Sequence, residues 1–289
     1  DALANHLIEL IGDKNKRCLL GEKLYKTASE KFSLKSMTET QLSIYNRIGQ
    51  QVEQSKNDGK VYDIAILGYY GYRNSGDDAI LKSIIDQLKQ SNQELSVMVF
   101  SNNPYETRTV YKVQSVHRFH PFKVPALLSK TRLFIAGGGT LIQDGTSSRS
   151  LWYYLFMLYL AKKRGARAVL LANGLGPLTR KKNRRVASKI LNSMDAITLR
   201  DSNAYEELVS LNVTKPIIKV AADPALTLTC RDLSPGLKIL KEEGVPTDKK
   251  LVALCLRKWK KVRNATQILA SLADKIVTEM ASGGSAFDV

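Results

Sequence analysis

Between Val61 and residue 221, short apolar segments alternate with amphipathic ones, and this alternation limits the fold more than any other feature of the chain. We predict strands at 63–68, 96–101, 132–137, 167–172, 196–200 and 217–221, and helices near 77–90, 150–164, 181–194 and 202–211. The first helix has one apolar face, made of Ile80, Leu81, Ile84, Ile85 and Leu88. The pattern predicts an α/β protein in which helices cover both faces of a parallel sheet.

The two flanks of this region have different patterns. Residues 1–58 show only helical spacing, and the polar stretch SKNDGK at 55–60 predicts a boundary. The α/β unit then covers 62–230, and 231–250 is a polar connection that contains Pro and Gly. Residues 251–289 begin a further strand, a helix at about 265–282 and the start of one more strand. Because a strand–helix–strand fragment is too small for a domain, we expect the natural protein to continue as a second domain.

Charge and composition favour some partners over others. The formal net charge is +17, with basic runs at 179–185 and 249–263, which favours anionic partners, although a solvated basic face also explains one such run. We find no nucleic-acid-binding motif and predict no nucleic-acid partner. The 3 cysteines lie far apart and the 3 histidines lack metal-ligand spacing, which predicts no metal site and a reducing, cytoplasmic location.

The longest apolar run, LWYYLFMLYLA at 151–161, has 11 residues. A helix needs roughly 20 apolar residues to span a bilayer, so this run predicts a mostly buried helix. A peripheral contact with an anionic membrane, at the inner face, remains open.

Polar residues follow the first strand in the stretch GYYGYRNSGDDAIL, residues 68–81. Asn74 or Ser75 can cap the next helix, and Asp77 and Asp78 stand in its first turn. The carboxylates would repel a pyrophosphate, and GxGxxG is absent, so a dinucleotide site is disfavoured. Asn, Ser and carboxylate groups suit the hydroxyls of a sugar, whereas plain helix capping would also explain them. We assign Tyr70 and these four residues to a substrate site.

A second polar stretch, GGGTLIQDGTSSRS at 137–150, follows the third predicted strand. The backbone of Gly138 and Gly139, with Arg149, is a plausible anion cradle. Gln143 and Asp144 add groups that bind hydroxyls. A simple strand-to-helix turn is the alternative.

Two further arginines end predicted strands. Arg200, followed by Asp201, points toward the same edge of the sheet as Arg149, unless it serves only in a salt bridge. Arg257 occupies the corresponding position after 251–256, near Trp259. Ser-His-Asp, HExxH and P-loop patterns are absent, which argues against a hydrolase with a covalent nucleophile.

Six blocks of the sequence, in order, resemble the polysaccharide pyruvyl transferase family, and most closely its CsaB branch, over residues 62–289. They are GYYGYRNSGDDAIL, FIAGGGTLIQDGTSSRSLWYY, ANGLGPL, ITLRDSNAYEEL, AADPALTL and LCLRKW. The resemblance implies a fold similar to GT-B glycosyltransferases, with two Rossmann-like halves facing a cleft. It also implies transfer of pyruvate from phosphoenolpyruvate, as a ketal, onto two hydroxyls of one sugar in bacterial cell-wall or exopolysaccharide synthesis.

In the CsaB branch the acceptor is an N-acetylmannosamine residue of a lipid-pyrophosphate-linked disaccharide in bacteria that carry S-layers. Phosphoenolpyruvate has a carboxylate and a phosphate, and the guanidinium groups of arginines can bind both with paired hydrogen bonds. A general acid together with such arginines is sufficient for the transfer, so no cofactor or metal is expected. The family's histidine and further basic residues belong to its second half. We therefore expect the catalytic acid beyond Val289, assign no catalytic residue, and predict that the chain alone lacks pyruvyltransferase activity.

Residues 1–58 resemble the carboxyl end of a retaining GT-B glycosyltransferase, which implies a fusion of the two enzymes; a helical extension of the sheet unit is the alternative. Two other functions remain open for the chain. One is a GT-B glycosyltransferase that uses a nucleotide sugar. The other is a basic, non-catalytic module that holds lipid-linked glycans at a membrane surface.

Overall fold

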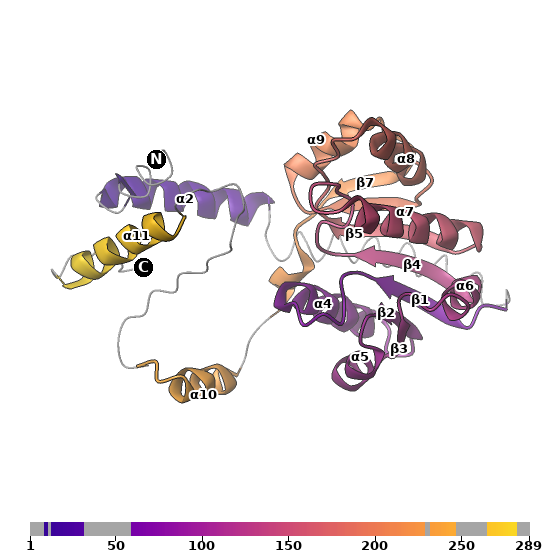
Figure 1. Ribbon diagram of the computed structural model, residues 1–289, viewed down its shortest axis with the longest axis horizontal. Helices are drawn as coiled ribbons and strands as arrows, with labels where there is room; N and C mark the ends of the chain where they lie inside the picture. The colour runs from indigo at the N-terminus through magenta and orange to yellow at the C-terminus, as the bar shows by residue number, and fades with distance from the viewer. Residues whose placement is uncertain (1–8, 11–12, 32–58, 229–231, 247–264, 282–289) are drawn as a thin grey trace. The chain divides into compact units, whose positions relative to one another are not determined.

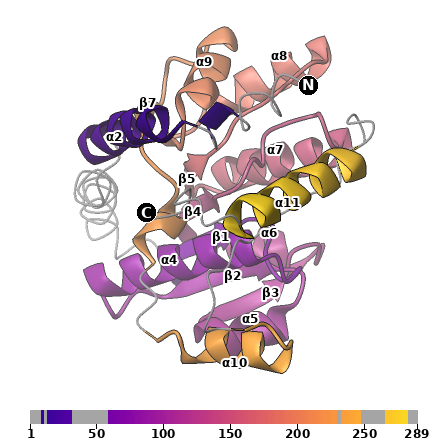
Figure 2. The same ribbon diagram turned by 90° about the vertical axis from the view of Figure 1, so that its left-hand side faces the viewer.

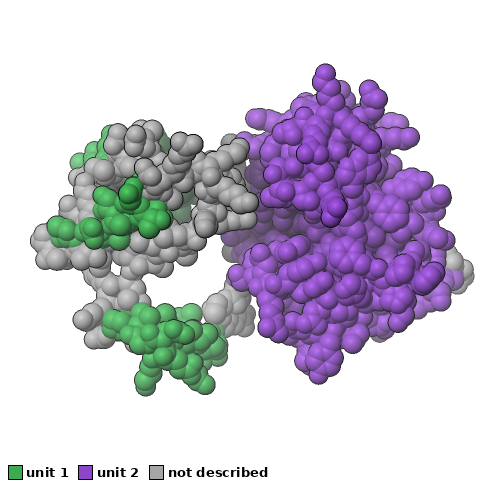
Figure 3. All heavy atoms as spheres, in the orientation of Figure 1, with its two compact units in different colours: residues 1–31, 230–289 green, residues 32–229 purple. Residues whose placement is uncertain are grey.

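The computed structural model describes residues 9–10, 13–31, 59–228, 232–246 and 265–281. These residues form two compact units, which Figure 3 distinguishes by colour. One unit comprises residues 32–229 and contains every strand that the structure describes. The other comprises residues 1–31 and 230–289 and contains the helices α2 (Lys14–Lys31), α10 (Ser234–Glu242) and α11 (Ala265–Ala281).

The larger unit is built on a parallel sheet of seven strands in the order β3-β2-β1-β4-β5-β6-β7 (Figure 1). The strands are β1 (Tyr62–Leu67), β2 (Val97–Ser101), β3 (Gln114–His117), β4 (Thr131–Gly137), β5 (Arg167–Asn173), β6 (Ala196–Leu199) and β7 (Ile217–Val220). The chain runs outward from β1 to β3, then returns to β4 on the other side of β1. The α/β class and the parallel sheet are therefore confirmed, and the order reverses between β1 and β4.

Alternating side chains of the strands enter two separate cores. Ile64 and Ile66 of β1 pack with α4 (Ser75–Ser91), whereas Ala65 and Leu67 belong to the core under α7 (Ser148–Lys163). Because successive strand residues point to opposite faces, α4 and α7 lie on opposite faces of the sheet (Figure 2). Both faces are covered, as predicted.

Other helices complete the two layers. On the α7 face, α7 contacts α6 (Lys123–Ser129) on one side and α8 (Lys181–Leu191) on the other, and α9 (Ser202–Ser210) packs against β6. On the α4 face, α5 (Pro104–Tyr111) contacts β2 and β3, and the 3-10 helix η1 (Pro224–Thr227) contacts α4.

The sequence pattern does not predict several of the elements that the structure contains. Strand β3 is QSVH, with only Ser115 buried, so nothing in its composition marks a strand. Helix α10, SPGLKILKE, lies where the sequence predicts a polar connection, because Pro and Gly are typical of loops. Its proline stands in the first turn, where a missing N–H costs little. Helices are present in 14–31 and 265–281 as predicted.

Some predictions fall outside the described residues, namely the strand at 251–256, the strand start after 282 and the boundary residues 55–58. Among the helices that the structure describes, none is long and apolar enough to cross a membrane.

Candidate functional site

Five loops gather at the carboxyl edge of the sheet, where the strand order reverses between β1 and β4. In open α/β sheets, ligands bind outside the carboxyl ends of the strands at such a switch point. The loops after β1 and β4 flank it directly. Backbone hydrogen bonds join neighbouring loops: Gly174 N after β5 donates to Gly139 O after β4 at 2.9 Å, and Arg200 N after β6 donates to Asn173 O at 3.3 Å.

The loop after β1 leads into helix α4 through an Asx cap. The side-chain oxygen of Asn74 accepts hydrogen bonds from Gly76 N at 3.1 Å and Asp77 N at 3.3 Å. Ser75 is the first helical residue and is exposed. Asp78, in the first turn, accepts a hydrogen bond from the Tyr111 hydroxyl at 3.2 Å. Asn74 therefore has the capping role that the sequence left open. Ser75, Asp77 and Asp78 lie in the first turn of α4, beside the switch point.

Asp77 is the most perturbed carboxyl group of this edge. Its pKa is raised from 3.8 to about 6, first by burial and then by the negative charges of Asp78 and Asp223, while the positive charge of Arg200 opposes them. The loop after β4 lies close to it, since a Cβ built on Gly139 would stand 3.3 Å from Asp77 Oδ1. A carboxyl group with a pKa near 6, at a switch point, can both donate and accept a proton near neutral pH.

The glycines after β4 are required by geometry. Gly138 and Gly139 have φ of 71° and 68°, in the left-handed region that favours glycine. A Cβ on Gly138 would come within 2.2 Å of Ile80 Cγ2 in α4. The amide of Gly138 donates to Leu171 O at 3.0 Å, so this amide is used inside the protein. The pair lets the β4 loop approach α4 closely, which positions Asp77 against it.

Arg200 connects three of the loops at this edge. Its guanidinium donates to Asp223 Oδ2 at 3.2 Å and to Thr140 Oγ1 at 3.1 Å, and its Nε lies 3.7 Å from Asp201 Oδ2. The absence of a side chain at Gly174 makes room for it, because a Cβ there would lie 3.1 Å from Arg200 Nε. The side chain is about one third exposed. The salt bridge that the sequence offered as an alternative exists, and it lies at the carboxyl edge itself.

Asp223 was not predicted, although its block AADPALTL belongs to the resemblance. It caps η1 by accepting from Ala225 N at 3.0 Å. Ser83 of α4 holds η1 in place by donating to Pro224 O at 2.6 Å and by a 2.7 Å hydrogen bond with the Thr227 hydroxyl. Helix α4 therefore carries Asp77 and also fixes the segment that brings Asp223 near it.

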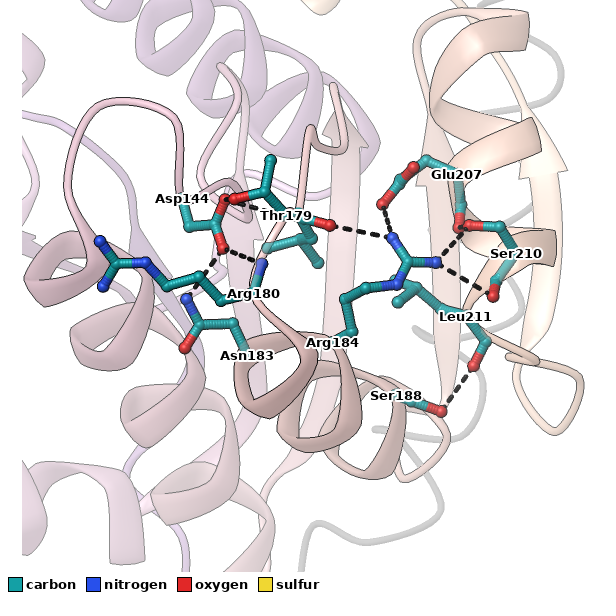
Figure 4. Close-up of polar contacts among 10 residues, drawn as sticks. Asp144, Thr179, Arg180, Asn183, Arg184, Ser188, Glu207, Ser210 and Leu211 are labelled. Atoms are coloured by element: carbon teal, nitrogen blue, oxygen red, sulfur yellow. Dashed lines mark hydrogen bonds and ion pairs between the residues drawn. The ribbon is translucent and has the colours of Figure 1, made fainter.

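Asp144, which the sequence assigns to the binding of hydroxyls, is enclosed by hydrogen-bond donors of the protein itself. It is 9% exposed, and its carboxylate accepts hydrogen bonds from Thr179 N at 2.9 Å, the Thr179 hydroxyl at 3.0 Å, Arg180 N at 3.1 Å and Asn183 Nδ2 at 2.9 Å (Figure 4). Burial opposes ionisation, but these hydrogen bonds lower the pKa to about 2. The carboxylate ties the β4–α7 loop to the start of α8.

Tyr70 is also placed differently from the expectation. Its side chain is fully buried, and its hydroxyl donates to Gly137 O at 2.8 Å. This hydrogen bond joins the loop after β1 to the end of β4. A substrate cannot reach this side chain in the structure. The apolar environment of the two neighbouring strand ends explains why the ring is in the core.

The remaining predicted residues have the following positions. Gln143 is half-buried and turns back onto its own loop, where its Oε1 accepts from Thr146 N at 3.0 Å. Asp201 caps α9 by accepting from Ala204 N at 2.7 Å. Arg149 is exposed in the first turn of α7, at the end of the helix nearest the carboxyl edge. Arg257 lies outside the described residues.

A buried arginine that the sequence did not single out supports the β1 loop. Arg118, 3% exposed, donates to Gly68 O at 2.8 Å, and its guanidinium lies 4.6–5.8 Å from the ring centres of Tyr153, Phe119, Tyr154 and Tyr72. Tyr72 stacks on Tyr69, with ring centres 4.1 Å apart and planes 6° apart, and both rings are partly exposed. This aromatic group borders Asn74 and Ser75 along the chain.

The described residues contain no group of three or more His, Cys, Asp and Glu side chains that could hold a metal ion. His117 and His120 each accept a hydrogen bond from a nearby backbone N–H, from Phe119 at 3.4 Å and Lys123 at 3.2 Å.

Known proteins resemble the chain to different degrees. A search of curated proteins gives no match. Among solved structures, HepE from Anabaena, crystallised in complex with UDP, matches with 17% sequence identity and a TM-score of 0.40. The match covers 63% of this chain and 50% of HepE, so the chain spans half the length of that protein.

The family comparison covers most of the chain. The family model described as polysaccharide pyruvyl transferase matches residues 74–284, well over half of the chain. The match begins at the cap of α4 and includes Asp77, Gly139, Arg200 and Asp223. This chain belongs to the polysaccharide pyruvyl transferase family.

Proposed function

We propose that the protein transfers pyruvate from phosphoenolpyruvate onto two hydroxyls of one sugar in a polysaccharide precursor, forming a ketal. The observation that supports this proposal best is Asp77, a carboxyl group with a pKa of about 6 at the switch point, inside the region that matches the family. Ketal formation from an enol phosphate begins with protonation of carbon, which requires such an acid.

Asp77 is the proposed proton donor. It protonates the methylene carbon of phosphoenolpyruvate, which becomes the methyl group and leaves an oxocarbenium-like centre at the adjacent carbon. One sugar hydroxyl adds there and gives up its proton. Phosphate then leaves, and the second hydroxyl closes the ketal. Of the two protons that the hydroxyls release, one returns to Asp77 and the other accompanies phosphate, so the acid is regenerated.

The charges of the described edge suit the acceptor better than the donor. Asp201 and Asp223 pair with Arg200, and the negative charges of Asp78 and Asp223 act on Asp77 beside them. A trianionic donor would be repelled by such a group alone, whereas carboxylates accept hydrogen bonds from sugar hydroxyls. We therefore place the acceptor against these carboxylates. The outer face of the Tyr69–Tyr72 pair offers the sugar's C–H groups an electron-rich aromatic surface.

The donor's anionic groups need additional cations. Arg149 is exposed at the start of α7, where the helix N-terminus also favours negative charge. Arg257 is the second proposed clamp, on the strength of the resemblance alone. Guanidinium groups suit both the carboxylate and the phosphate because each can form two parallel hydrogen bonds. By the same resemblance, the acceptor is an N-acetylmannosamine residue on a lipid pyrophosphate, and no cofactor or metal takes part.

The experiment compares donors in the full-length protein. Phosphoenolpyruvate and UDP-sugars are titrated by calorimetry, and phosphate release from phosphoenolpyruvate is followed with and without the lipid-linked acceptor. We expect binding of phosphoenolpyruvate and acceptor-dependent release. Asp77→Asn should lower turnover by a factor on the order of 10²–10⁴, the usual contribution of a general acid. Asp86→Asn, at a half-exposed carboxylate that pairs with Lys82 on the same helix, is the matched control and should remain active.

Two outcomes would contradict the proposal. Consumption of a UDP-sugar without binding of phosphoenolpyruvate would make the protein a glycosyltransferase. Full turnover of Asp77→Asn would mean that another residue is the proton donor.

A further inference from the structure

Helix α7 exposes a row of aromatic side chains on the side that faces away from the sheet. Trp152, Phe156 and Tyr159 are 38%, 55% and 48% exposed. Their spacing of four and then three residues places them on one face of the helix. The opposite face, with Leu151, Leu155 and Leu158, is buried in the core. Aromatic residues exposed in such a row are an apolar surface that none of the described residues of this unit covers.

Basic side chains flank this row. Helix α8, which packs beside α7, has exposed lysines and arginine at Lys181, Lys182, Arg185 and Lys189. The Lys182 ammonium lies 5.5 Å from the ring centre of Trp152, and that of Lys163 lies 5.9 Å from Tyr159. Arg149 is exposed at the start of α7. We call the three aromatic residues together with these basic residues of α7 and α8 the α7 surface.

Helices α6, α7 and α8 contain no acidic residue that would balance this charge. Between residues 107 and 194 the sequence contains a single acidic residue, Asp144, which is buried. The next acidic residue along the sequence, Asp195, forms an ion pair with Lys162 at 2.7 Å. The α7 surface is therefore positive throughout, and its partner must be anionic.

The surface is held in place from beneath. Trp152 Nε1 donates to Asn183 Oδ1 at 3.2 Å, and Asn183 donates to the Asp144 carboxylate. Arg184 of α8 donates to Glu207 Oε1 at 2.7 Å and to the Ser210 hydroxyl at 2.9 Å, which joins α8 to α9 (Figure 4). The aromatic and basic groups are thus displayed by two fixed helices, and little ordering is required when they bind.

We propose that the α7 surface docks the protein on an anionic lipid bilayer, lying on it rather than crossing it. Tryptophan and tyrosine prefer the interface between lipid and water, and each lysine or arginine near an anionic surface adds attraction. A second copy of the chain does not fit, because two such surfaces would bring like charges together. A nucleic acid would use the basic groups but offers no apolar layer to a row of aromatic side chains on one helix.

The proposal stands on the α7 surface alone and does not depend on the reaction. It nevertheless suits a substrate carried on a lipid, because the α7 surface begins at Arg149, beside the carboxyl edge. A docked protein would meet lipid-linked acceptors in two dimensions.

The test is co-sedimentation of the full-length protein with vesicles of phosphatidylcholine, with and without phosphatidylglycerol. We expect binding only to the anionic vesicles, weakening as salt rises. Lys182→Gln combined with Arg185→Gln should weaken it by a factor on the order of ten. Phe156→Ser combined with Tyr159→Ser should weaken it at every salt concentration. Lys215→Gln with Lys219→Gln, and Tyr105→Ser, remove exposed groups from other elements and should bind normally.

Three results would overturn the proposal. These are equal binding to neutral and anionic vesicles, equal loss with the control variants, and a dimer in ultracentrifugation that the Phe156 and Tyr159 substitutions abolish. Circular dichroism of each variant separates misfolding from lost binding. Turnover with a soluble acceptor fragment should be unchanged in the α7-surface variants, which keeps this test separate from that of the proposed reaction.

Discussion

Asp77 combines stability and proposed activity in one carboxyl group. Because its pKa is about 6 in the folded protein and 3.8 ordinarily, the folded state binds more protons between these values. The stability associated with this group is full below pH 3.8 and is lost as pH rises through 6. Near neutral pH the ionised carboxylate is therefore a cost that the fold carries, a pattern often found at functional sites.

The substitution Asp77→Asn should consequently stabilise the protein at pH 7.5 by about 1 kcal/mol, since partial exposure and the lost helix-dipole interaction reduce the effect. The gain should vanish near pH 4, where Asp77 is protonated. Urea unfolding of both proteins at the two pH values checks this. Equal stability differences at both would mean that the pKa of Asp77 is ordinary.

In the unsubstituted enzyme, turnover should fall about ten-fold per pH unit above 6 if the acid form is required.

Asp144 shows the opposite linkage. Its pKa of about 2 means that the stability it contributes is present above pH 3.8 and is lost as pH falls through 2. Asp144→Asn replaces one carboxylate oxygen by an NH₂ group, which cannot accept the hydrogen bonds of the backbone N–H donors. It should destabilise the protein by about 2 kcal/mol at pH 7. Gln143→Ala, in the same loop, should cost under about 1 kcal/mol because its hydrogen bonds are local and half-exposed. Thermal unfolding measures both, and equal costs would contradict the anchoring role.

At the scale of single residues, the sequence identified groups but not their partners. It placed Asp77, Asp78 and Arg200 at strand ends correctly, because apolar strands end where polar residues begin. It assigned Tyr70 and Asp144 to a ligand, although the first is buried and the second is enclosed by donors from residues 179–183. Arg118 was missed because its partner, Gly68, lies 50 positions away in the sequence. Asp223 was missed because its position depends on Ser83, whose partner Pro224 lies 141 positions from it.

At the scale of elements, the approach of the β4 loop to helix α4 is the contact that shapes the site. Gly138→Ala would combine a left-handed backbone with a Cβ 2.2 Å from Ile80. We expect a loss of about 3 kcal/mol in stability, from backbone strain and overpacking together. Gly145→Ala, in the same loop, has no positive φ and a nearest contact of 3.4 Å. It should change stability by less than about 0.5 kcal/mol, and an equal loss at both positions would contradict the account.

The predictability of the strands followed their apolar content. The six strands with apolar runs were found to within about one residue, and the four helices between them to within about three residues, close to the usual uncertainty of boundaries. Strand β3 and helix α5 were not predicted, because their sequences, QSVH and PYETRTVY, contain few apolar residues. They gain their stability from neighbours in the sheet, which no local pattern reveals.

At the scale of the whole molecule, both hydrophobic cores of the sheet unit lie within residues 62–225. Deleting residues 1–58 should therefore leave the unfolding midpoint of the remainder within a few degrees of the original, since no described core residue is removed. Differential scanning calorimetry of the shortened chain tests this. If the remainder fails to fold, residues 1–58 are integral to the sheet unit, and their predicted origin in a separate glycosyltransferase fold is wrong.

The measurement that tests the central claim most directly is proton NMR of the full-length protein's reaction with phosphoenolpyruvate and a lipid-linked N-acetylmannosamine acceptor in D₂O. If an acid protonates the methylene carbon, the ketal methyl group must carry one deuterium, and one phosphate must appear for each ketal. We predict this CH₂D signal in the unsubstituted protein and in Asp86→Asn, and its loss in Asp77→Asn. Unchanged phosphoenolpyruvate, with glycosyl transfer from a UDP-sugar to the same acceptor, would contradict the account.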